Sequence, residues 1–448
     1  MGWCSRRASP RRSPGSAAAP PRRAVRTALA ILAAALAAAC ARPPAERPYV
    51  LRLAVVGRFS PLDPLGSEGH AMLAHDLVYQ GALAPGADGT PRPGVARVVE
   101  RRGPRSCRLR VEPTAAFSDG APVTPEDLAR SARAAGLAAE AAADGSVTVS
   151  SEGRAVEAAL LFTAVFRPGP RGAMGTGPYR MVEQSADRMV LERVRPAPRR
   201  IARVEVIGFP SERDALARLL RGDVNAMIGL DQRSMDLLED VPGLRPIRAP
   251  GPHAWTVILN ERRLGGAQRR RLQAALPVAE LVAAVCGAEA AGAPAGAERP
   301  ARAIPPGAPL RILVIGDGVG ERRGALALRR ALGRRGGEIV PFDAGAGVEE
   351  QIAGADLVLT RQVVWPPIAV AQVWAAGSPF AAAGYRDAEL EAAIARGDAD
   401  AAVRRLREDG PAVRLCRTTR AGAVDARIRG AAFGWGALDL LPDWEVAP

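Results

Sequence analysis

The hydrophobic pattern in the first half of the chain predicts short strands separated by helices. An apolar run over residues 49–56 predicts a buried strand that ends at Gly57, and residues 67–83 have the apolar spacing of a helix. A turn rich in proline and glycine follows at residues 85–93. The other strands predicted in this half are residues 107–111, 146–150, 189–194, 204–209 and 224–228.

Two helices in this half have recognisable starts. Thr124 stands where an N-cap is expected, with Pro125 in the first helical position, which predicts a helix that runs to about Ala135. Ser211 is the expected N-cap of a helix over residues 212–221, which Gly222 ends.

The second half predicts the same alternation. Its strands are residues 253–260, 310–315, 338–342, 356–359 and 413–416, and its helices are residues 268–286, 322–334, 387–395 and 400–407. Residues 287–309 are rich in Ala, Gly and Pro and predict a linker or a loose loop. Strands that alternate with helices predict α/β layers. The chain exceeds the usual size of one hydrophobic core, so two or more lobes are expected.

The N-terminal 39 residues have the pattern of an export signal. They contain seven arginines and no acidic residue, and their uncharged run over residues 27–39 is too short to span a bilayer. The string AAAC at residues 37–40 resembles a bacterial lipobox, which implies that Cys40 is lipidated and becomes the new N-terminus. The alternative is ordinary cleavage that leaves Cys40 as a plain thiol. Residues 40–48 form a short proline-rich tether.

Charge and cysteine content narrow the classes further. Every basic residue is Arg, and removal of the seven signal arginines lowers the net charge from +14 to +7. Because the arginines are spread along the chain with few aromatics between them, nucleic-acid binding is not expected. Cys107, Cys286 and Cys416 are far apart, so one disulfide could form among them, but the sequence does not choose the pair. His70 and His75 cannot share a helical face, so neither a metal site nor a cofactor is expected.

The strongest motif is the string FSDGAPVTPEDL at residues 117–128. It describes a strand, a tight turn and a helix start. The string resembles the F-S-D-G-x-P-[VL]-T-A-x-D-V hallmark of the periplasmic dipeptide, oligopeptide and nickel-type solute-binding proteins (solute-binding protein family 5). Further strings resemble that family's motifs in the family's order: DLVYQGAL at residues 76–83, the DG-to-P turn at 88–93, GTGPY at 175–179, GDV at 222–224, Asn260, GY at 384–385, EDGP at 408–411 and RG at 429–430.

This resemblance implies an α/β, two-lobed periplasmic-binding-protein (Venus-flytrap) fold, type II-like, with a reduced extra subdomain, because the stretch between Leu128 and Gly175 is short. Lobe I is expected at residues 49–260, with 425–448 returning to it, and lobe II at 261–424. The implied function is that of an extracytoplasmic lipoprotein, not an enzyme, which delivers a peptide-like or other small solute to an ABC permease and ATPase complex. We expect a monomer, held at the membrane by its N-terminal lipid.

The predicted ligand segment departs from the family. Peptide binders carry a W-x-x-D-Y-x-x-P string, whereas this chain has RQVVWPP at residues 361–367 and no Asp or Glu from 357 to 386. Binding of a free peptide ammonium there is therefore doubtful, because a buried ammonium needs a charge partner. Trp365 could stack on a ligand or pack in the core. The residues expected to line the cleft, by position, are Arg58, Phe59, Trp255, Arg361, Gln362 and Trp365.

Two other functions stay open. The stretch Gly316-Asp317-Gly318-Val319-Gly320 between a strand and a helix could be the loop of a nucleotide- or S-adenosylmethionine-dependent enzyme, although Glu321 stands where the fingerprint has its third Gly. A tight connection between strand and helix is the preferred interpretation of this loop. The chain could also be a degenerate family member with a role in sensing or envelope assembly.

Overall fold

The structure, a computed structural model, describes residues 49–448 apart from 67–70, 87–88, 153–154, 170–171, 287–306, 317, 344, 376–377, 435 and 448. The predicted signal peptide, the tether with Cys40, and His70 lie outside the described residues, as does most of the predicted 287–309 linker. Among the helices that are described, none has the length and apolar character needed to cross a membrane.

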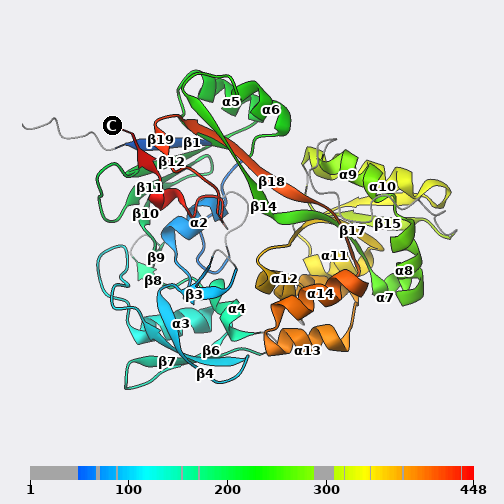
Figure 1. Ribbon diagram of the computed structural model, residues 1–448, viewed down its shortest axis with the longest axis horizontal. Helices are drawn as coiled ribbons and strands as arrows, with labels where there is room; N and C mark the ends of the chain where they lie inside the picture. The colour runs from blue at the N-terminus through cyan, green and yellow to red at the C-terminus, as the bar shows by residue number, and fades with distance from the viewer. Residues whose placement is uncertain are drawn as a thin grey trace, which may run out of the picture. The chain divides into compact units, whose positions relative to one another are not determined.

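A ten-stranded mixed sheet runs through the fold (Figure 1). Parallel pairing joins β1 to β12 and β13 on one side, and β15 to β16 and β17 on the other. The strands in spatial order are β10 (Tyr179–Gln184), β11 (Arg188–Arg193), β12 (Arg203–Phe209), β1 (Val50–Val56), β13 (Ala226–Ile228), β18 (Ala412–Asp425), β14 (Leu244–Leu259), β17 (Leu357–Val363), β15 (Leu310–Val314) and β16 (Gly337–Pro341).

Strands β14 and β18 join the two halves of this sheet as a long antiparallel pair (Figure 1). The sequence predicts only short strands here, at 253–260 and 413–416, and both predictions are too short. Pro246, Pro250 and Pro252 interrupt the apolar pattern of β14, and the pairing with β18 shifts register between Pro250 and Ala254. The register shift accommodates Pro252, whereas Pro246 and Pro250 pair with Ala423 and Thr419 within the regular register.

The first half of the sheet is covered by helices on both faces. Its core holds Leu51, Leu53 and Val204 with residues of α2 (Met72–Val78), and Trp444 near the C-terminus is completely buried in it. The other face packs against α5 (Glu212–Leu220) and α6 (Gln232–Leu238). Helix α2 is shorter than the predicted 67–83, because the chain is extended at Tyr79 and enters strand β2 (Leu83–Pro85), which pairs with β3 (Pro91–Pro93).

A small subdomain with its own core follows β3. Strands β4 (Ala96–Arg101), β5 (Ser106–Val111), β7 (Ser146–Ser150) and β6 (Ala138–Ala141) form an antiparallel sheet, which packs against α3 (Pro125–Ala134) and α4 (Val156–Leu161). Thr124 caps α3 as predicted, and Asp127 completes a capping box by accepting from the Thr124 backbone N–H at 3.0 Å. The hairpin of β8 (Phe166–Gly169) and β9 (Gly172–Gly175) leads the chain back to the large sheet.

The motifs of the first half meet at the end of α2. The Gly177 N–H donates to the carbonyl of Val78 at 2.8 Å, and the Ser118 N–H donates to the carbonyl of Gly175 at 3.0 Å. A Cβ at Gly175 or at Gly177 would collide with carbonyl oxygens of α2. The GTGPY string and the end of the DLVYQGAL string are therefore two sides of one backbone contact.

In the second half, helices cover both faces of β17, β15 and β16. One core contains α8 (Gly266–Ala275), α9 (Val278–Cys286) and α10 (Val319–Ala331), and the other contains α11 (Val348–Gly354), α12 (Pro367–Val373), α13 (Ala388–Arg396) and α14 (Ala399–Asp409). The predicted helix 268–286 is broken into α8 and α9 at Pro277, which has no N–H to continue the ladder of α8. The short helix α7 (Glu261–Leu264) leads from β14 into α8.

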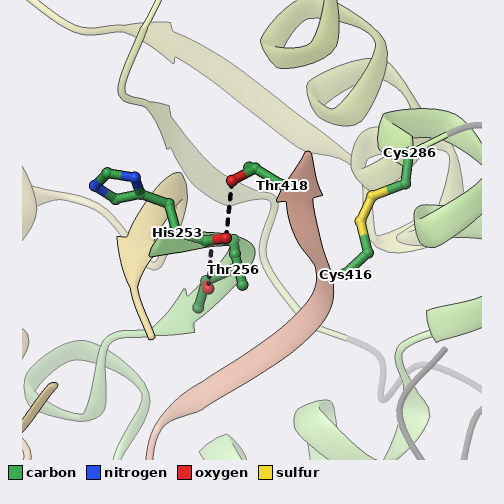
Figure 2. Close-up of a disulfide and its surroundings, with 6 residues drawn as sticks. His253, Thr256, Cys286, Cys416 and Thr418 are labelled. Atoms are coloured by element: carbon green, nitrogen blue, oxygen red, sulfur yellow. Dashed lines mark hydrogen bonds between the residues drawn. A yellow bond between two sulfur atoms is a disulfide. The ribbon is translucent and has the colours of Figure 1, made fainter. Parts of the chain in front are cut away.

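A disulfide joins Cys286, at the end of α9, to Cys416 in β18 (Figure 2). The sequence left this pairing open. Cys107 is a buried free thiol, and burial raises its pKa to about 12, which keeps it protonated and unreactive. The bridge thus ties the helix before residues 287–306 to one of the two long strands.

Candidate functional site

The six residues expected to line a cleft fall into different environments. Arg58 is exposed just after β1. Phe59 is buried in the core of the first half of the sheet, among residues of β1 and α2. Trp365 is half-buried in the connection from β17 to α12, and its backbone N–H donates to the carbonyl of Pro252 at 3.3 Å. Trp255, Arg361 and Gln362 lie on the adjacent strands β14 and β17.

Trp255 and Arg361 are direct cross-strand partners. The Arg361 guanidinium lies 5.7 Å from the centre of the Trp255 ring, a cation–π arrangement. Both residues are on the face of the sheet that α10 covers, because Trp255 packs in the same core as α10. Two of the residues predicted from the sequence, Trp255 and Arg361, are therefore neighbours in the fold.

Gln362 lies on the opposite face, although it follows Arg361 in the chain. Successive residues of a strand point to opposite sides, so Gln362 points toward the core that contains α12. Its side chain is only 2% exposed, and its Nε2 has no hydrogen-bond partner among the described residues. Arg361 and Gln362 therefore cannot act together on one side of the sheet.

Glu321 completes the group, although it is not one of the six residues that the sequence predicts for the site. Its carboxylate Oε1 is 3.0 Å from Nη2 of Arg361. The Glu321 side chain is 4% exposed, whereas that of Arg361 is 56% exposed. The pair therefore has its acid inside the protein and its base at the surface.

The glycine-rich stretch before α10 surrounds this carboxylate. A Cβ at Gly316 would lie 2.9 Å from Oε1 of Glu321, and a Cβ at Gly318 would meet Oε2. Glu321 stands where the dinucleotide fingerprint has its third Gly, and its carboxylate lies against Gly316 and Gly318. The glycines at this turn make room for the carboxylate of Glu321. This supports the interpretation of the turn as a tight connection between β15 and α10 rather than as a cofactor loop.

A buried, neutral histidine lies near this group. His253 precedes Trp255 by two residues on β14, and its pKa is lowered to about 4 by burial and by the positive charges of Arg420 and Arg361. His253 is therefore neutral at pH 7. Its backbone carbonyl accepts from Oγ1 of Thr418 at 2.9 Å, which fixes β14 to β18 beside the disulfide (Figure 2).

Trp255, Glu321 and Arg361, which we call the arginine cluster, lie at the carboxyl ends of the parallel strands β15 and β17. Open α/β sheets bind ligands at this edge. A fixed guanidinium beside an indole can hold a planar, hydrogen-bond-accepting group. Among the described residues, no group of three or more metal-ligating side chains comes together.

Comparison with known proteins shows the fold without a close sequence relative. No protein-family model and no curated protein matches the chain. Among solved structures it is similar to the ABC transporter substrate-binding protein CtaP from Listeria monocytogenes, with 14% identity over 90% of this chain and 100% of that chain and a TM-score of 0.68. The oligopeptide-binding protein AppA from Bacillus subtilis, solved with a nonapeptide, has 14% identity, the same two coverages and a TM-score of 0.67.

A third similar structure is AgaA in complex with agropinic acid from A. tumefaciens R10, with 14% identity over 89% of this chain and 99% of that chain and a TM-score of 0.70. These likenesses define the class of fold. The chain has the two-lobed α/β fold of periplasmic binding proteins, type II-like, as the motifs predicted. The subdomain built from β4 to β7 with α3 and α4 lies in the part of the chain where the motifs predicted a reduced extra subdomain.

Proposed function

We propose that the chain is an extracytoplasmic solute-binding protein of family 5 that captures a small solute and delivers it to an ABC importer. The observation that carries the proposal is the arginine cluster at the carboxyl ends of β15 and β17, next to the strand pair β14 and β18. The motif order and the fold shared with substrate-binding proteins support it. Capture and release need no covalent chemistry, so the chain acts as a receptor and not as an enzyme.

In this proposal the solute lies between lobe I, residues 49–260 with 425–448, and lobe II, residues 261–424. We place the hinge within the long strands β14 and β18 at their register shift between Pro250 and Ala254, because Asn260 and Asp425 lie at opposite ends of this pair. Trp255 and Arg361 contact the solute directly. Arg58 and Trp365 approach it from the connections that follow β1 and β17, and Phe59 and Gln362 support the walls from their buried positions.

Cys40 is the proposed membrane anchor of the mature chain. A single lipidated Cys would hold the receptor beside an importer and leave its lobes free to move. Labelled palmitate should join the wild type and should not join Cys40→Ala, which should leave the membrane fraction. A Cys40→Ala variant that stays membrane-bound contradicts the anchor and leaves export untouched.

Native mass spectrometry of the purified mature protein tests the receptor function. We expect a co-purified small molecule that is lost on unfolding and whose return changes tryptophan fluorescence. Mature protein that carries no ligand, and gives no fluorescence change with extracts of culture medium, would contradict the proposal.

A degenerate role in sensing or envelope assembly is the second candidate. The absence of Asp and Glu from residues 357–386 favours it, because the peptide-binding acid is missing. Genes for a permease and an ATPase beside the gene of this protein would count against it.

A further inference from the structure

We infer that the solute is an acid, and that the Arg361 guanidinium binds its carboxylate. The inference rests on the proposed receptor function and names the class of solute for the same site. It starts from the asymmetry of the Arg361–Glu321 pair, in which the carboxylate is buried and the guanidinium is half-exposed.

In an ordinary surface ion pair both charged groups remain in water, and the pair contributes little to the stability of the fold. Here Glu321 is withdrawn into the protein, where a carboxylate is stable only with a close charge partner and a fitted surrounding. The surrounding is the glycine-rich stretch, in which Gly316 and Gly318 leave no room for a Cβ next to the carboxylate. This arrangement places Oε1 of Glu321 3.0 Å from Nη2 of Arg361, an ion pair in which Oε1 has no hydrogen-bond partner among the described residues.

The guanidinium of Arg361 also has N–H donors that a ligand can use. Glu321 contacts Nη2, while Nε and Nη1 of Arg361 have no protein acceptor among the described residues. A guanidinium presents its N–H groups in a planar fork that fits a carboxylate with two parallel hydrogen bonds. The indole of Trp255 lies against the same group and holds it in orientation. A side chain ordered before binding loses less entropy when the ligand arrives.

The surrounding charges favour an anion over a cation. Residues 357–386 supply no carboxylate, and Glu321 is already paired with Arg361. Neutral His253 lies near two arginines, Arg361 and Arg420, whose charges both act to keep it unprotonated. A ligand ammonium would meet the exposed guanidinium of Arg361 and be repelled by it, whereas a carboxylate would be attracted.

The competing interpretation is that the pair only stabilises the start of α10. The variant Arg361→Lys distinguishes this interpretation from solute recognition, because Lys keeps the positive charge that faces Glu321 but lacks the planar fork of N–H groups. A purely structural pair predicts unchanged solute binding in this variant. A recognition role predicts weaker binding of acids while the protein stays folded, as checked by circular dichroism and urea unfolding.

The experiment extracts the bound solute by denaturing wild type, Arg361→Lys and the control Arg110→Lys, all purified in parallel. Arg110 is an exposed arginine on β5 of the subdomain, far along the chain from the cluster. Each extract is analysed by mass spectrometry before and after methyl esterification, which marks carboxylic acids. The same proteins are titrated with N-acetyl-dialanine, which has a carboxylate and no ammonium, and with dialanine amide, which has the reverse.

We expect an esterifiable solute in wild type and in Arg110→Lys, at least tenfold less of it in Arg361→Lys, and a preference of wild type for N-acetyl-dialanine over dialanine amide. A neutral or cationic solute present equally in all three proteins overturns the acid inference and leaves the receptor function standing. An absence of solute from all three proteins, with no response to either probe, overturns both.

Discussion

Gly320 lies against the edge of the Trp255 indole, so closely that a Cβ added to Gly320 would come within 2.6 Å of Cζ2 of the ring. Gly320 belongs to the first turn of α10 and Trp255 to β14. The last glycine of the loop thus sets the position of the aromatic ring that holds Arg361. The loop and the cluster are one packed unit.

The variant Gly320→Ala tests this contact. Alanine favours a helix over glycine by about 1 kcal/mol, but the added methyl group must push the indole away, and overpacking costs about 1–3 kcal/mol. We expect a net loss of about 1 kcal/mol in the free energy of unfolding and a shift of tryptophan emission. Urea unfolding followed by fluorescence measures both.

Gly347→Ala is the matched control for that variant. Gly347 caps α11 with a φ of −59°, and a Cβ there would meet nothing within 4 Å. Its stability should stay within about 0.5 kcal/mol of wild type, as for other surface substitutions. A stabilised Gly320→Ala with unchanged emission would show that the indole does not lie where we place it.

Removal of the buried charge of Glu321 should destabilise the protein. Glu321→Gln keeps the shape of the side chain but loses the ion pair with Arg361, so we expect a loss of about 1–2 kcal/mol. The loss stays modest because Arg361 is 56% exposed and can be hydrated. A double-mutant cycle with Arg361→Met, measured by urea unfolding, should give a coupling of about 0.5–3 kcal/mol. Strictly additive effects would mean that the two side chains do not interact.

The Cys286–Cys416 disulfide should contribute clearly to stability. It closes a loop with a sequence separation of 130 residues, and loss of a native disulfide typically costs about 2–5 kcal/mol. Replacement of both cysteines by Ser should lower the unfolding midpoint to that of the reduced wild type, and reductant should then have no further effect. Cys107→Ala keeps the bridge and serves as the control. A non-reducing peptide map that joins Cys107 to either partner would contradict the pairing.

His253 should make stability fall in mild acid. Its pKa is about 4 in the folded protein and 6.5 in the ordinary state, so only the unfolded chain gains this proton as the pH falls below 6.5. Neutral His253 contributes its full stabilisation above pH 6.5. As the pH falls from 6.5 to 4, the free energy of unfolding decreases by up to about 3 kcal/mol. The difference in unfolding free energy between pH 7.5 and 4.5 should be smaller in His253→Gln than in wild type. If the two proteins lose equal unfolding free energy between pH 7.5 and 4.5, the His253 side chain is not buried as described.

Much of the local structure could be predicted where a signal lies within a few residues. Thr124 and Ser211 cap their helices as expected, since a capping residue and its partner are three positions apart. The alternation of residues 107–111 predicted β5 within one residue. The lengths of β14 and β18 could not be predicted, because their stability comes from pairing with each other across more than 150 residues of chain.

The candidate site shows the same limit. Trp255 and Arg361 were found by their place relative to motifs, and the fold brings them together. Gln362 was predicted by the same positional argument, but it follows Arg361 in a strand and therefore lies on the other face of the sheet. Glu321 was noticed only as the residue that breaks the glycine fingerprint. Its partner is forty positions away, so nothing local indicated the ion pair.

The long strand pair has a consequence for how this protein can change. The N–H of Leu259 donates to the carbonyl of Pro411 at 2.8 Å, so the chain leaves β14 and re-enters β18 at one point. Everything between these two residues is topologically an insertion whose ends already touch. This insertion also contains β17, which pairs with β14 over residues 253–259, and Cys286, which is bonded to Cys416. A replacement segment must therefore supply a strand partner for β14 as well as ends that meet.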